Sequence, residues 1–107
     1  MTFKWPSKDP DETLDYSMDW SRFLNSQAII STATWFVDDE SNIKTQFNTT
    51  AQIVNGIQFV GQSNTSSVAT INIGLGTTNK KYKFSCQILD TSGTVAERTV
   101  SLTIKEN

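Results

Sequence analysis

The sequence of 107 residues contains no histidine and a single cysteine, Cys86. Without histidine the chain cannot build Ser-His-Asp or Cys-His nucleophilic centres, and it lacks the commonest zinc ligand. One cysteine cannot close an internal disulfide, which fits synthesis in a reducing cytoplasm. We therefore expect a protein that is not an enzyme and that carries no metal ion or other cofactor.

Long apolar runs and blocks of like charge are also missing. Hydrophobic residues make up 36% and charged residues 19% of the chain, and the formal net charge is -2 with a pI near 4.9. No stretch is long and apolar enough for a signal peptide or a membrane helix, and no basic patch marks a nucleic-acid-binding surface. The length predicts one domain, with neither a membrane nor a nucleic acid as its partner.

The pattern that is present is alternation of apolar and polar residues, which is typical of half-buried strands. It is clear from Leu14 to Trp20, where Tyr16 and Met18 alternate with aspartate and serine. The stretch 28–37 is rich in β-branched and aromatic residues, which favour strands. Alternation there predicts one buried face made of Ile29, Ala33, Trp35 and Val37.

Shorter strand-like stretches follow, separated by turn signals. The stretches are residues 43–47, 53–60, 68–73, 81–89 and 100–104, and the polar turns are 38–42, 62–66, 74–79 and 90–93. Asn55-Gly56, inside one of these stretches, is a strong hairpin or bulge signal. About seven strands without a helical stretch predict an all-β fold, an immunoglobulin-like sandwich of two sheets.

The same alternation predicts the core of the sandwich. Trp35 is the candidate central aromatic residue, and Cys86 is expected to be a buried, unreactive thiol. Tyr82 stands where such domains fold a tyrosine hydroxyl back onto the upstream loop, although an ordinary half-buried strand tyrosine remains the alternative. The lack of a second cysteine departs from antibody-type domains. The predicted core residues are Tyr16, Trp20, Trp35, Tyr82, Phe84, Cys86 and Leu102.

Residues 1–12 have the pattern of neither a strand nor a helix, and we expect them to form an extended N-terminal arm on a sandwich of residues 13–107. Two prolines in this segment bias the residues before them toward extended geometry. Two interpretations of its large aromatic residues remain open: the rings dock in a neighbouring subunit, or they cover the open end of their own sandwich. The candidate partner-docking arm comprises Phe3, Trp5, Pro6 and Pro10.

The acidic residues do not have the spacing of a metal or catalytic site. The densest group lies in residues 9–19, but it lacks the aspartate-rich motif with glycine of a calcium loop. Asp15 and Asp19 are expected on the outward face of a strand, so the group is interpreted as a solvated surface. Asp38-Asp39-Glu40 is interpreted as a turn, since nothing pairs it with a second acid across a cleft.

Residues 8–20 carry a more specific signal. Their order, Lys-Asp-Pro-Asp-Glu followed by Leu-Asp-Tyr-Ser-x-Asp-Trp, resembles the start of a family of small virion proteins of tailed bacteriophages, the fiber–tail adaptor and related neck and tail proteins. The resemblance continues in the stretch 29–35, which ends in a tryptophan, in Tyr82, in Ser92-Gly93 and in the last strand at 97–102. It covers nearly the whole chain, but it rests on no motif within residues 48–67.

The resemblance implies a structural virion protein of the phage neck or tail, an adaptor that links fibers or connector proteins to the particle. Its partners are then other virion proteins, such as connector, tail or fiber proteins, and copies of itself in a symmetric assembly. It also implies synthesis in the cytoplasm of the bacterial host. Two alternatives remain open: an immunoglobulin-like capsid decoration protein, and a carbohydrate-binding or adhesion module.

Overall fold

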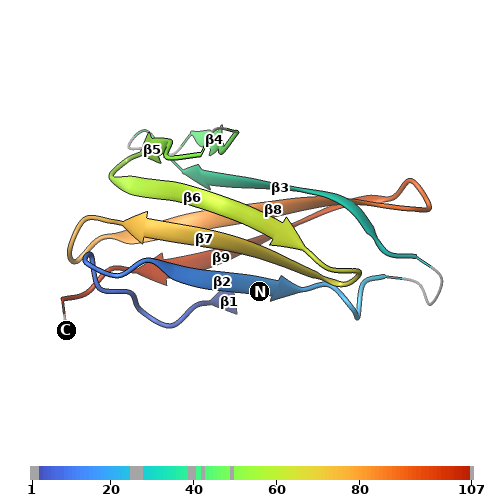
Figure 1. Ribbon diagram of the computed structural model, residues 1–107, viewed down its shortest axis with the longest axis horizontal. Coiled ribbons are helices and arrows are strands. Elements are labelled where there is room, and N and C mark those ends of the chain that lie inside the picture. The colour runs from blue at the N-terminus through green and yellow to red at the C-terminus, as the bar shows by residue number, and fades with distance from the viewer. Residues whose placement is uncertain (1–2, 25–27, 39–40, 42, 49, 107) are drawn as a thin grey trace.

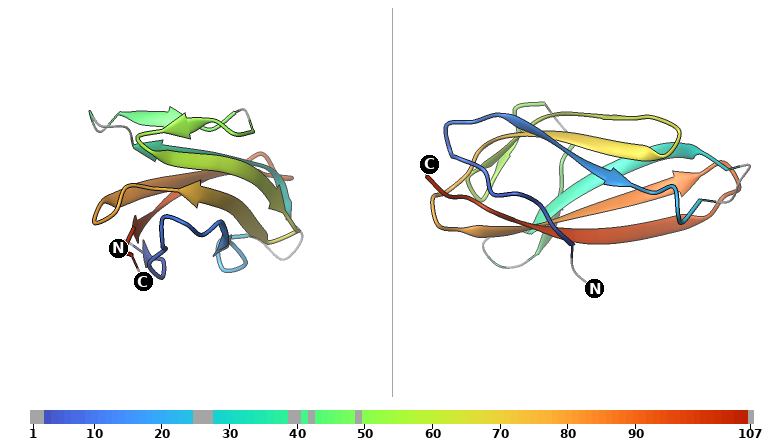
Figure 2. Two further views of the ribbon diagram at one scale, coloured as in Figure 1. Left: turned by 60° about the vertical axis from the view of Figure 1, so that its left-hand side comes forward. Right: turned by 90° about the horizontal axis from the view of Figure 1, so that it is seen from below.

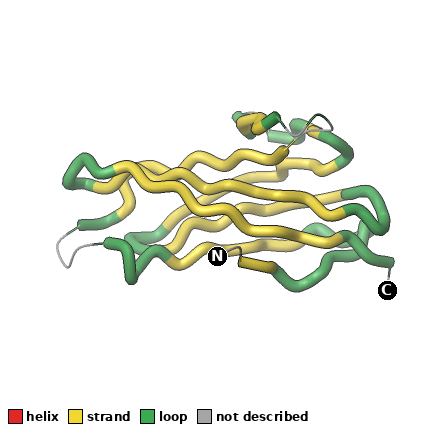
Figure 3. Tube along the Cα trace, turned by 180° about the vertical axis from the view of Figure 1, so that it is seen from behind, coloured by secondary structure: helices red, strands yellow, loops and turns green. Residues whose placement is uncertain are grey.

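The computed structural model describes residues 3–24, 28–38, 41, 43–48 and 50–106, and of Phe3 only the backbone. Within them the chain forms nine strands and no helix, in two stacked sheets (Figures 1 and 3). No helix of the described residues could therefore cross a membrane. One sheet has the order β1 (Phe3–Lys4), β9 (Val95–Thr103), β8 (Lys81–Asp90), β3 (Ile30–Asp38) and β4 (Lys44–Gln46). The other has the order β2 (Leu14–Asp19), β7 (Val68–Leu75), β6 (Ile57–Asn64) and β5 (Ile53–Val54).

Strand pairing confirms the predicted immunoglobulin-like sandwich. Neighbouring strands run antiparallel except β1 and β9, which are parallel. One sheet is built around β3, β8 and β9, and the facing sheet around β2, β7 and β6. The chain crosses between the sheets from β1 to β2, from β2 to β3, from β4 to β5 and from β7 to β8, as in this fold. Asn55 and Gly56 both have positive φ, 55° and 89°, and they close the tight hairpin from β5 to β6.

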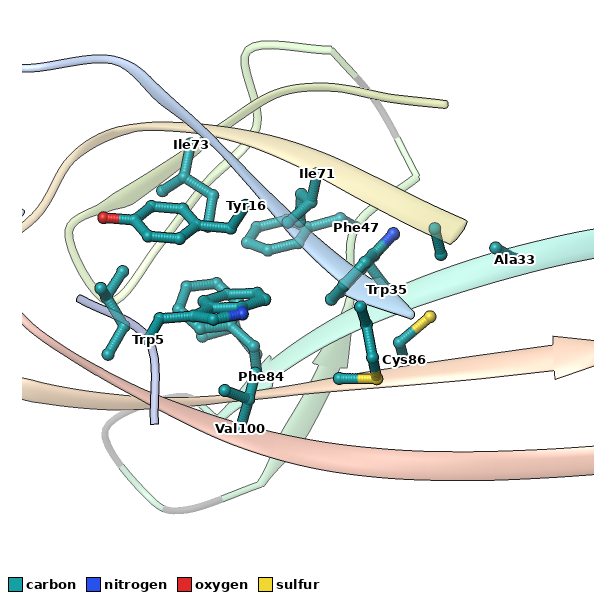
Figure 4. Close-up of a cluster of buried hydrophobic side chains, with 14 of the residues drawn as sticks. Trp5, Tyr16, Ala33, Trp35, Phe47, Ile71, Ile73, Phe84, Cys86 and Val100 are labelled. Carbon is teal, nitrogen blue, oxygen red and sulfur yellow. The ribbon is translucent and has the colours of Figure 1, made fainter. Parts of the chain in front are cut away.

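The core lies between the inner faces of the two sheets (Figure 4). Trp35 of β3 pairs in register with Cys86 of β8, and both side chains are fully buried. Ile71 and Ile73 of β7 face them from the other sheet. The inward residues follow the two-residue period of each strand, because successive side chains of a strand point to opposite faces.

The Tyr82 hydroxyl folds back as predicted from the sequence. It donates a hydrogen bond to the carbonyl oxygen of Asn55 at 2.7 Å and accepts one from the backbone N–H of Thr77 at 3.0 Å. The ring itself is buried beside Phe84, with 6.4 Å between the ring centroids. This one hydroxyl therefore joins the β5–β6 turn to the loop before β8.

Replacing Tyr82 with phenylalanine should lower the free energy of unfolding by about 1–2 kcal/mol, because two backbone groups lose their partner. Tyr16→Phe is the matched control, since that hydroxyl makes a single, longer hydrogen bond to the carbonyl of Pro6 at 3.3 Å. Urea denaturation of both variants measures the difference. Equal losses would show that the fold-back of Tyr82 adds nothing to an ordinary tyrosine contact.

The strands differ from the prediction in one register and in the ends of two strands. Ile29 was expected on the buried face but is 46% exposed, whereas Ile30 is buried. The pairing of β3 with β8 shifts by one residue between Ile30 and Thr32, and this irregularity exchanges the two faces. The predicted turn at 62–66 and loop at 74–79 also begin too early, because β6 continues to Asn64 and β7 to Leu75.

Residues 3–12 are part of the sandwich and do not form a separate arm, which corrects the expectation for that part of residues 1–12, while residues 1 and 2 lie outside the described residues. β1 pairs with β9, the N–H of Trp5 donates to the carbonyl of Ser101 at 2.9 Å, and Lys8 bridges to Ile104. Trp5 is buried in the core of its own domain, stacked on Tyr16 with 4.7 Å between ring centroids. Its indole fills the gap between the edges of the two sheets, which explains why an irregular segment carries a large aromatic residue.

A buried lysine fixes this segment at the end of the sandwich. Lys8 is fully buried, and its Nζ donates to the carbonyl of Asp9 at 2.8 Å and to that of Leu75 at 2.6 Å. Burial lowers the pKa of Lys8 below its ordinary value, although the nearby Glu12, Asp9 and Asp11 oppose this change. The ammonium group thus ties the chain before β2 to the last residue of β7.

Candidate interaction surface

A groove of about 590 Å³ lies between the end of β2 and the side of β9. Among the described residues β1 pairs with β9 at Val100 and Ser101, and the groove lies beside the part of β9 that precedes these positions. The right-hand view of Figure 2 shows β1 against the middle of β9, with the earlier part of β9 running on beside the end of β2. The lining residues are Lys4, Trp5, Ser17, Met18, Asp19, Trp20, Ser21, Arg22, Phe23, Arg98 and Val100.

The floor of this groove is apolar. Trp5, Met18, Trp20 and Val100, which line it, are residues of the hydrophobic core. The half-buried ring of Phe23 stands nearly perpendicular to Trp20, at 79° and 5.8 Å between centroids. The groove therefore offers the half-buried ring of Phe23 beside buried core residues.

Arg98 occupies an unusual position in β9. Val100, Leu102 and Ile104 point into the core, and the two-residue period places Arg98 in the same register. Its guanidinium lies over the rings of Trp20 and Phe23, 5.2 and 5.6 Å from their centroids. Cation–π contact of this kind holds an arginine against aromatic surface while its donors stay accessible.

Positive charge gathers at the groove although the whole chain is acidic. Both arginines of the sequence, Arg22 and Arg98, line it, together with Lys4. Asp19 is the acidic residue in the lining, and the N–H of Ser21 donates to its Oδ1 at 2.9 Å, which lowers the pKa of Asp19. The lining thus carries three cations and one anion.

The predicted site residues divide into two groups. The seven predicted core residues all lie in the hydrophobic core. Of the candidate docking arm, Trp5 is buried in its own domain, the side chain of Phe3 lies outside the described residues, and Pro6 is exposed and Pro10 half-buried. A docking role for the two prolines stays a prediction.

The remaining predicted features lie away from the groove. Asp15 faces outward and lines a polar hollow of about 230 Å³ on the outer face of the four-stranded sheet. Asp9 is buried, and its Oδ1 accepts a hydrogen bond from the N–H of Asp11 at 2.8 Å, so this acid serves a local turn. Burial raises the pKa of the Cys86 thiol to about 12, which keeps it protonated and unreactive at neutral pH.

Sequence reasoning missed the cations of the groove and the buried Lys8. Arg98 had a detectable signal, because it interrupts an alternating apolar run from Ala96 to Ile104 at an inward position. Arg22 and Lys4 lie in irregular segments, and only the fold brings them together with Arg98. Lys8 lies in a segment without any period, so nothing marked it as buried.

Comparison with known proteins identifies one family. A family model described as podophage GP4 fiber-tail adaptor protein gp77 matches residues 8–103, which is most of the chain. The search of curated proteins finds no match. The matched range includes β2 to β9 and with them most of the groove lining, while Lys4 and Trp5 precede it.

Proposed function

The chain belongs to the family of podophage fiber-tail adaptor proteins, and on this premise we propose that it joins fiber to tail purely by binding, without catalysing a reaction. It is a structural component of the phage virion with a tail adaptor role, and it binds other virion proteins. The family match over residues 8–103 carries this conclusion. The lack of histidine and the high pKa of the one thiol support the absence of catalysis.

We further propose that the adaptor acts in several copies around the tail, with contacts between copies, after synthesis in the host cytoplasm. A rigid sandwich with strand edges and turns at both ends supplies several separate contact areas on a small chain. Repetition around a symmetric particle raises the effective concentration of each contact, so individually weak contacts suffice. The free thiol of Cys86 is compatible with a reducing cytoplasm.

The two alternative functions receive less support. A carbohydrate-binding module needs exposed aromatic rings for stacking, but all three tryptophans are buried. A capsid decoration protein shares the sandwich fold, but the family match is to a fiber-tail adaptor.

A cryo-EM map of the intact particle tests the proposed function. We expect repeated copies of this chain at the joint between fibers and tail, each contacting a fiber protein and a tail protein. Copies on the capsomers instead would identify a decoration protein, and absence of the chain from particles would contradict a virion role altogether. Particles assembled without the chain should lack fibers while their tails remain complete.

A further inference from the structure

We propose that an extended, acidic segment of another virion protein adds to β9 as a strand along Val95–Thr99 and inserts an apolar side chain into the groove beside it. The proposal rests on the adaptor function and names the chemistry of one of its partners. Three observations carry it: an open strand edge, an excess of positive charge, and an apolar floor at the same place. β-strand addition is a common way for proteins to bind extended segments.

The backbone of β9 is open along this stretch. Trp5 donates to the carbonyl of Ser101 and Lys8 to that of Thr103, so these carbonyls face the outer side of β9. Backbone groups alternate in direction along a strand, which places those of Val95, Glu97 and Thr99 on the same outer side. In the described part of the chain, no strand pairs with β9 there.

A side-chain contact supports this direction. Nη1 of Arg98 donates a hydrogen bond to the carbonyl oxygen of Glu97 at 3.4 Å, which agrees with a carbonyl that points away from β8, and an added strand would replace Arg98 as its donor. Five residues of strand span about 17 Å, enough for an incoming segment to make several backbone hydrogen bonds. The new strand would lie in line with β1, on the part of β9 that β1 leaves uncovered.

The charges favour an acidic occupant. Lys4, Arg22 and Arg98 line the groove against Asp19 alone. Glu97 does not reverse this balance, because it points to the opposite face of the sheet and pairs with Lys44 at 2.7 Å. An incoming carboxylate would reach the arginines as a charge-assisted, bidentate contact.

The apolar floor of the groove sets a second requirement for the partner segment, which is a large apolar side chain. Side chains of an added strand alternate between the two faces of the sheet, so every second one would point toward Trp20 and Met18. An apolar side chain there would pack against the half-buried ring of Phe23, beside the buried floor residues Trp20 and Met18. The partner segment therefore combines acidic residues with at least one large apolar residue.

The position of Arg98 also fits a different function, the protection of an edge strand against aggregation, and an experiment has to distinguish it from ligand binding. Inward-pointing charges on edge strands also serve to prevent aggregation between edges. Such protection would repel every added strand, whatever its charge. Binding through the groove would instead discriminate by charge and require the backbone of the ligand.

Synthetic peptides separate these functions. The probe is a nine-residue peptide, capped at both ends, with glutamate, leucine and glutamate at its third, fifth and seventh positions, which share one face of a strand, and threonine elsewhere. Its counterparts carry lysine for glutamate or N-methyl groups on alternate amides. With the 15N-labelled chain, we expect the acidic peptide alone to shift the amides of Val95, Glu97 and Thr99. Arg98→Glu should weaken its affinity about tenfold or more, whereas Lys83→Glu on the outer face of β8 should change it little.

The outcomes are distinct. Equal binding of the acidic and basic peptides, or unchanged binding of the N-methylated peptide, would refute strand addition by an acidic segment. No binding of any peptide would favour edge protection. In the particle map, a bare β9 edge or a second copy of this chain on it would overturn the inference, although the adaptor function would stand. Absence of the chain from the tail would contradict the adaptor function itself.

Discussion

Replacing Trp5 with alanine is expected to lower the free energy of unfolding by about 3–5 kcal/mol, the usual loss for a large buried aromatic side chain. The indole is in contact with rings from both sheets: it stacks on Tyr16 of β2 and lies 5.6 Å from Phe84 of β8 and 5.9 Å from Trp35 of β3, centroid to centroid. Its Nε1 also donates to the carbonyl of Ser17 at 3.3 Å. Removal would open a cavity where the sheet edges meet (Figure 4).

Chemical denaturation monitored by circular dichroism measures the loss. Trp5→Phe is the control, because it retains most of the apolar contact and loses only the indole N–H and part of the ring. We expect this variant to lose less than half as much. A deletion of residues 1–10 should behave like Trp5→Ala or worse, since it removes the pairing of β1 with β9 as well. A deletion variant as stable as the full chain would show that Trp5 is dispensable to the fold.

Replacing Lys8 with alanine is expected to cost about 2–4 kcal/mol, because the carbonyls of Asp9 and Leu75 lose their donor and a cavity remains. Lys8→Met retains the buried stem and removes the desolvated charge, so its cost should be about half as large. Urea denaturation at neutral pH ranks the variants. If methionine is as harmful as alanine, the hydrogen bonds of Nζ dominate; a fully stable alanine variant would contradict a role for Lys8 in the fold.

The pH dependence of the Lys8 contribution has a definite sign. The pKa of Lys8 is lower in the folded chain than its ordinary value of 10.5, so the unfolded chain binds more protons between these two values. In this window the stability of the wild-type chain rises with pH relative to Lys8→Met, because the cost of the buried charge disappears. Comparing the two proteins at pH 7 and at about pH 10 isolates this effect from the other titrating groups.

The sequence predicted the burial of a residue correctly where the residue lies in a regular strand, and failed where the backbone is irregular. Tyr16, Trp35 and Phe84 lie in regular alternating strands, where a period of two residues determines the face. Ile29 fails this rule because one irregular pairing reverses the face, and no local pattern marks it. Trp5 lies in a segment without a period, and the residues that bury it are distant in the sequence.

The candidate interaction surface was less accessible to such reasoning. Its walls come from three separate segments, and only their spatial arrangement shows that both arginines face the same groove. Of the groove residues, Arg98 alone could have been noticed in the sequence, because it occupies an inward position in an otherwise apolar alternating run. Its charge conflicts with the usual rule that charged residues of a strand point outward. Conflicts of this kind are expected where a surface serves binding.

The parallel pairing at the N-terminus also bears on mechanical load. The backbone from Phe3 to Lys8 lies along β9 in the same direction, linked by hydrogen bonds from Trp5 to Ser101, from Lys8 to Thr103 and from Lys105 back to Lys8. A force that pulls the two chain ends apart would slide these segments past each other and load all three bonds together. A fiber that swings in moving fluid exerts tension on its attachment point. Where a load enters through the two chain ends, this geometry shares the tension among several bonds instead of opening them one after another.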